Sequence, residues 1–112
     1  MPAKFIQEGA ALDYTPVADT PAGTVVVQSE MVGVTRVDLK AGQLGSLAVT
    51  GVFEFPKALG ASSAIPIGTL TYWDATNQVA TKNAAAGVNK LIGKCIKTTV
   101  DADLIVRVRL QQ

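Results

Sequence analysis

The chain of 112 residues is 48% hydrophobic and 17% charged, which predicts one small folded domain over residues 1–112 and excludes a disordered chain. Its ten basic and nine acidic residues are scattered and give a net charge of +1, so direct binding of nucleic acid through a basic cluster is excluded. The chain has no histidine, which excludes Ser-His-Asp triads, Cys-His dyads and most general bases that work near neutral pH.

The first half of the chain contains segments whose apolar residues alternate as in strands. Within Met31 to Leu39 the alternation changes parity, which a bulge near Thr35 and Arg36 would explain. Ser46 to Phe55 alternates throughout and predicts one long strand that bends at Gly51. Shorter strands are expected at Lys4 to Glu8, Leu12 to Thr15 and Thr24 to Gln28.

The second half continues in the same way. Asp103 to Leu110 alternates most regularly, with its even positions, Leu104 included, predicted to point inward. Asp74-Ala75-Thr76-Asn77 is typical of a hairpin turn. Two Ala-rich segments, residues 57–64 and 83–90, contain glycine and are expected to be loops. The remaining strands are expected at Leu70 to Asp74, Gln78 to Lys82 and Leu91 to Val100.

About nine short strands, short turns and little helix predict an all-β fold. The architecture is expected to be a small antiparallel β-barrel or a β-sandwich of the jelly-roll type. The longest uncharged stretch, Ala58 to Trp73, is too short to span a bilayer and contains Gly60 and Pro66, so no membrane partner is expected. The first residues lack the apolar run of a secretion signal, which predicts synthesis in a cytoplasm.

Tyr72 and Trp73 form the most conspicuous aromatic pair. Adjacent side chains on a strand point to opposite faces, so one is expected in the core and the other at the surface or at a subunit contact. Stacking of a ligand on Trp73 is the alternative. Cys95 lies in an apolar run and is expected to be a buried thiol.

No motif predicts a catalytic, metal or cofactor site. Gly87 to Cys95 has five residues between its glycines and a cysteine after the lysine, which does not fit a phosphate-binding loop. Asp101 and Asp103 could offer oxygen ligands to a cation, but a turn between the last two strands explains them better. A carboxylate enzyme would require Asp101, Asp103 and Glu54 to converge.

Several segments, taken in order and at their spacing, carry a resemblance to a known family. They are Phe5-Ile6-Gln7-Glu8-Gly9, Leu12-Asp13-Tyr14-Thr15, Thr50 to Lys57, Gly68 to Asp74, Leu91 to Cys95 and Ile105 to Leu110. Together they cover nearly the whole chain, which resembles the small phage head decoration or capsid cement proteins.

This resemblance implies a non-enzymatic virion protein made in the host cytoplasm. It implies a compact β domain on the outer surface of an icosahedral head, commonly a trimer rather than a dimer. Its partner would be the major capsid protein, whose neighbouring subunits it clamps after the shell expands.

Residues 1–8 are expected to form an extended N-terminal arm, since Phe5 and Ile6 have strand-like character. An extended arm can add a strand to a partner sheet, so Lys4, Phe5, Ile6 and Gln7 are the predicted capsid contacts. A small ligand-binding or glycan-binding β module, with Trp73 as the stacking platform, is the alternative function.

Overall fold

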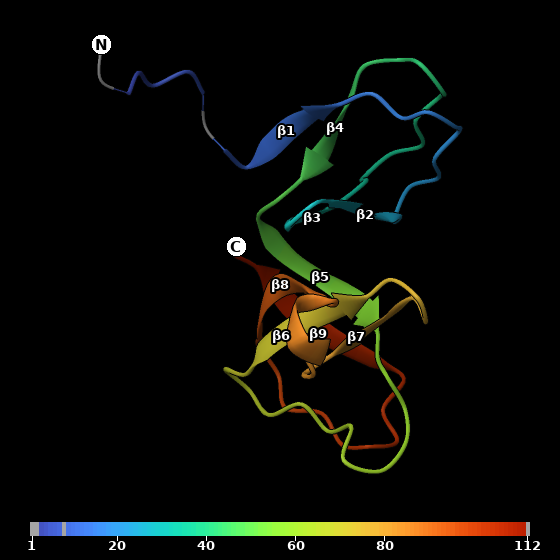
Figure 1. The fold of residues 1–112 in the computed structure, drawn as a ribbon, viewed down its shortest axis with the longest axis vertical. Helices are drawn as coiled ribbons and strands as arrows, with labels where there is room; N and C mark the ends of the chain where they lie inside the picture. The colour runs from blue at the N-terminus through green and yellow to red at the C-terminus, as the bar shows by residue number, and fades with distance from the viewer. Residues whose placement is uncertain (1–2, 8, 112) are drawn as a thin grey trace.

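The computed structural model describes residues 3–7 and 9–111, and in this part of the chain nine strands form two antiparallel sheets. The first sheet has the order β1-β4-β3-β2, and the second has the order β5-β9-β8-β6-β7. The strands of the first sheet are β1 (Ala11–Tyr14), β2 (Val25–Gln28), β3 (Met31–Val34) and β4 (Gly45–Ala48). Those of the second are β5 (Gly51–Pro56), β6 (Leu70–Asp74), β7 (Val79–Thr81), β8 (Lys90–Cys95) and β9 (Ile105–Leu110). The two sheets form the upper and lower halves of the molecule in Figure 1.

The all-β prediction is confirmed, but a closed barrel is not formed. The second sheet curls until its two edge strands approach, and a single bridge joins Lys57 to Ala80. In this bridge the Ala58 amide donates to the Ala80 carbonyl at 3.0 Å. One bridge does not make a ladder, so the sheet stays open between β5 and β7. The jelly-roll arrangement is likewise not confirmed.

The segment predicted as one strand over Ser46 to Phe55 is two strands in different sheets. β4 ends at Ala48 and β5 begins at Gly51, whose φ of +107° lies in the left-handed region that favours glycine. The chain therefore crosses from the first sheet to the second over two residues. Alternation continues through the crossing, which is why the sequence pattern alone suggests a single bent strand.

The strand predicted over Met31 to Leu39 is also shorter than expected, because the chain leaves the sheet after Val34. The buried hydroxyl of Thr35 donates to the Pro21 carbonyl at 2.8 Å and accepts the Thr24 amide at 2.9 Å. Beyond it, Leu39 pairs with Thr20 in an isolated bridge. The change of parity thus marks the end of a strand, and the bulge predicted near Arg36 was wrong.

Two further strand ends differ from the prediction, and one predicted strand does not form. β8 stops at Cys95, because the hydroxyls of Thr98 and Thr99 accept amides from the facing loop. β9 begins only at Ile105, and Leu104 is exposed rather than inward. No strand forms at residues 4–7, and Glu8 lies outside the described residues.

The core lies mainly in the second sheet and extends to the first. Val106, Val108 and Leu110 point inward from β9 as predicted, and Val32 and Val34 of β3 join the same cluster. This shared core connects the two sheets. The other buried members are Phe55, Ile65, Trp73, Ala80, Ile92 and Cys95, so the predicted burial of the Cys95 thiol is confirmed.

The loops follow the turn chemistry of their sequences. The predicted hairpin connects β6 to β7, and the Asp74 carboxylate accepts the Thr76 and Asn77 amides, each at 3.1 Å. Residues 83–90 are largely loop, with one 3₁₀ turn at Ala85–Gly87 before β8 begins at Lys90. No helix within the described residues is long and apolar enough to cross a bilayer.

Candidate functional site

The segment from Ala3 to Gln7 extends away from both sheets at the N-terminal end of the molecule (Figure 1). All five of its residues are exposed, and the Phe5 and Ile6 side chains are 69% and 76% accessible. The Gln7 side-chain amide donates to the Ala11 carbonyl at 3.5 Å. Two adjacent large apolar side chains on a protruding segment form a surface that water solvates poorly.

An open sheet edge lies directly after this segment. Among the described residues β1 pairs with β4 alone, so its other side is an open edge of the sheet. Such an edge can accept another extended chain. The predicted arm and the open edge are therefore adjacent in the chain. Of the predicted arm, residues 1, 2 and 8 lie outside the described residues.

Trp73 is a core residue in this structure. Its side chain is only 3% exposed, and its ring packs against Phe55 with centroids 6.0 Å apart and a tilt of 55°. A ring that is covered in this way offers no face on which a glycan could stack. Tyr72 is half-buried and points to the opposite side of β6.

The three carboxylates of the enzyme hypothesis do not assemble into a site. Asp101 accepts the amides of Ser62 and Ala64 and so ties two loops together. Asp103 accepts the Val100 amide at 2.9 Å. Among the described residues there is no group of three or more Cys, Asp or Glu side chains that could hold a metal ion. Asp101 and Asp103 act as loop residues, as the turn interpretation predicts.

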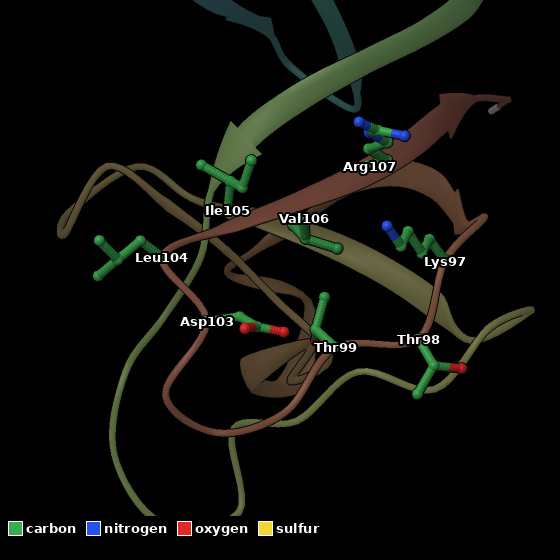
Figure 2. A pocket seen from close by; sticks show the side chains of 8 residues that line it. All are labelled: Lys97, Thr98, Thr99, Asp103, Leu104, Ile105, Val106 and Arg107. Atoms are coloured by element: carbon green, nitrogen blue, oxygen red, sulfur yellow. The ribbon is translucent and has the colours of Figure 1, made fainter.

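The surface hollows are small and open. One of about 210 Å³ lies beside the start of β9, where Lys97 to Thr99 face Asp103 to Arg107 (Figure 2). Another, near Gly9, Met31 and Arg109, has about 320 Å³. Their volumes reach at most the lower end of the range of small-molecule pockets, about 300–1,000 Å³, and the hollows are open to solvent. They therefore do not provide an enclosed ligand site.

A further surface was not recognised from the sequence, which suggests only a solvated face for Arg107 and Arg109. On one side of the second sheet, exposed basic and apolar side chains lie next to one another across four strands. We call this surface the basic face. Its residues are Val52, Glu54, Pro56, Leu70, Lys94, Ile96, Ile105, Arg107 and Arg109. In the sequence, the odd positions of β9 indicate part of this surface. Its residues in β5, β6 and β8 can be identified only once the strand register is known.

Comparison with protein families gives a match that covers most of the chain. A family model described as phage cement protein matches residues 6–110. The chain belongs to the phage cement protein family. No curated protein and no solved structure matches it.

The family confirms the resemblance found in the sequence segments. It indicates a structural role for this cement protein in a phage capsid, and a structural role does not require catalytic groups. The match begins at Ile6, so it includes Ile6 and Gln7 of the predicted contact residues but not Lys4 and Phe5.

Proposed function

We propose that this cement protein binds the outer surface of a phage head and stabilises the contacts between major capsid protein subunits. The observation that carries the proposal is the family match over residues 6–110. The partner is the major capsid protein, and the protein acts on the assembled virion. The working unit is a homotrimer, as the resemblance implies.

The surface of the molecule supports this role. Large apolar side chains are exposed on the N-terminal segment and on the basic face, including Phe5, Ile6, Val52 and Ile105. A protein that works alone in water gains nothing from them, whereas a protein that docks on a shell buries them. The fold supplies a rigid body, because its two sheets share one core.

The mechanism is mechanical rather than chemical. Packaged DNA pushes the shell outward, and a rigid body that spans a joint between subunits adds buried surface to that joint. When one molecule contacts two shell subunits, the second contact forms at a high effective concentration. Each bound copy therefore raises the force needed to separate the subunits.

The test uses expanded heads that have been stripped of their cement protein. Purified protein is added, and binding is measured by co-sedimentation. Bound heads should retain their DNA at a higher temperature than bare heads. Lack of binding to heads of the phage that encodes the protein, or binding without any gain in heat resistance, would contradict the proposal.

The glycan-binding alternative receives no support from the geometry, since Trp73 is buried against Phe55. The hollows on the surface are also too open to enclose a sugar.

A further inference from the structure

The basic face is an ordered array rather than a scatter of surface residues. The strand register places Leu70 of β6, Lys94 of β8, Arg109 of β9 and Val52 of β5 in one row across the sheet. Directly opposite residues in antiparallel strands point to the same side of the sheet. All four are exposed, so the row faces outward.

Two more rows continue the basic face along β9. The Ile96 amide donates to the Arg107 carbonyl at 3.0 Å, and Arg107 lies opposite Glu54. The last row pairs Ile105 with Pro56. Figure 2 shows Ile105 and Arg107 on one side of β9 and Val106 on the other. The outward rows and the buried core therefore occupy opposite sides of one strand.

The charges on the basic face are unbalanced. It has three basic side chains and one acidic side chain, Glu54. Lys94 and Arg109 lie directly opposite each other, and like charges in that position destabilise a sheet. Among the described residues, the ion pair within 4.0 Å joins Lys90 to Glu30 and involves no side chain of the basic face. A partner that brings carboxylates would relieve this repulsion.

The apolar residues of the basic face complement its charges. Val52, Ile105, Leu70 and Ile96 are 54%, 51%, 45% and 38% exposed. Aliphatic side chains with arginine among them are typical of protein interfaces. The basic face is thus suited to a protein surface that offers both apolar contact and negative charge.

The size of the basic face indicates which kind of partner it fits. Its nine side chains, at the usual residue rise and strand spacing of a sheet, cover roughly 300 Å². A stable pair of proteins buries about 800 Å² on each partner. The basic face alone is too small for a stable dimer, but it suffices as one of two contacts to the same large assembly.

We infer that the basic face docks on an acidic patch of a major capsid protein subunit. This inference rests on the proposed function and gives that function a second contact site. The basic face belongs to the second sheet, whereas the N-terminal segment extends beyond the first sheet (Figure 1). Contacts at two separate parts of the molecule allow it to bridge two shell subunits.

The decisive variant is Arg109→Glu, because it is expected to separate binding from folding. Glutamate at this position faces Lys94 and replaces a like-charge pair by an attractive one, so the thermal midpoint should stay equal or rise. Affinity for stripped heads should fall about tenfold or more, since a carboxylate now meets an acidic patch. A double variant, Arg107→Gln with Arg109→Gln, removes both positive charges without adding a negative one. Its affinity for stripped heads should also fall.

The control is Arg36→Glu, which makes the same change in charge at an exposed residue of the first half of the chain. It should bind heads like the wild type. Binding of wild-type protein should also weaken as salt rises from 50 to about 500 mM, because salt screens the attraction.

The outcomes distinguish the inference from the proposed function. Failure of the wild type to bind heads would overturn both. Wild-type binding that Arg109→Glu leaves unchanged would overturn the inference alone. A lower native mass of Arg109→Glu in the absence of heads would assign the basic face to contact between copies, and this too would overturn the inference.

Discussion

Gly93 shows how closely β8 and β9 approach each other. A Cβ built at this position would overlap the Arg109 carbonyl oxygen and lie 2.8 Å from the Gln111 nitrogen. Both obstacles are backbone atoms, one in β9 and one in the residue directly after it, so they cannot move aside as a flexible side chain would.

We therefore predict that Gly93→Ala lowers the free energy of unfolding by at least about 2 kcal/mol, as overpacking in a rigid site does. Urea unfolding would measure the loss. Gly9→Ala is the matched control, because a Cβ there meets nothing within 4 Å. Equal stability of the two variants would contradict this account of the strand contact.

Lys57 is a residue whose environment the sequence did not reveal. Its side chain is only 2% exposed, and its ammonium donates to the Ala58 carbonyl at 2.8 Å. It also donates to the Ser63 hydroxyl and the Asp101 carbonyl, each at 3.1 Å. A buried charge is tolerated when its hydrogen bonds are satisfied. Ala58 and Ser63 lie close to Lys57 in sequence, but the Asp101 carbonyl comes from a distant loop, so local patterns cannot predict the burial.

Asp74 links the β6–β7 turn to the pH dependence of stability. Hydrogen bonds from the Asn77 side chain and amide, and from the Thr76 amide, lower the pKa of Asp74 below its ordinary value of 3.8. A carboxyl group with a lowered folded-state pKa stabilises the fold above its unfolded pKa. That contribution is lost as the pH falls through the folded value.

The expected result is a pH-dependent effect of Asp74→Asn. Near pH 7 the wild type should have the higher thermal midpoint, and the difference should shrink below about pH 4. Calorimetry at several pH values would measure both midpoints. A difference that stays constant from pH 7 down to pH 2 would show that the charge of Asp74 does not stabilise the turn.

At the level of elements, alternation predicts the strands well wherever one face is buried. The buried Val106, Val108 and Leu110 of β9 follow the expected parity. Alternation does not predict where strands end, because the pattern of apolar side chains carries no information on where backbone pairing stops. Thus Leu104 continues the pattern but is exposed, and the crossing at Gly51 joins two strands whose patterns happen to agree. These ends are set by contacts with distant loops.

The N-terminal segment is the element whose role is easiest to test. Deletion of residues 1–7 should abolish binding to stripped heads while leaving the thermal midpoint nearly unchanged, because Ala3 to Gln7 are exposed and contribute no strand. Co-sedimentation and calorimetry would measure the two effects.

A matched control replaces two exposed apolar residues elsewhere, Val17 and Val88, with serine. These substitutions remove comparable apolar surface from turns outside the arm and should leave head binding intact. If the deletion variant occupies heads as fully as the wild type, Lys4, Phe5, Ile6 and Gln7 are not capsid contacts.

At the scale of the whole molecule, the sequence predicts the fold class but not the arrangement of the sheets. Composition and alternation require an all-β protein, whereas the division into a four-stranded and a five-stranded sheet depends on pairings between distant segments. The basic face illustrates the same limit. Its arginines are visible in the sequence, but their neighbours Val52, Lys94 and Leu70 are brought beside them only by the register.

The shape and surface of the molecule lead to a prediction about its assembly. The extents are 46 × 36 × 24 Å, and exposed apolar residues such as Leu44, Leu59 and Val37 lie outside both the N-terminal segment and the basic face. Contact between copies would bury such residues, and a closed ring repeats the same contact around its axis. Three copies on one axis would also bring three arms to the shell and multiply the avidity.

We therefore expect the isolated protein to form a trimer. Since one chain has a mass of 11.6 kDa, native mass spectrometry should give about 35 kDa, which is three times that value. Arg109→Glu should have the same native mass as the wild type, because we expect the basic face to contact the shell and not another copy. A native mass of one chain, or of two, would contradict the trimer while leaving the binding of heads to be judged by its own experiment.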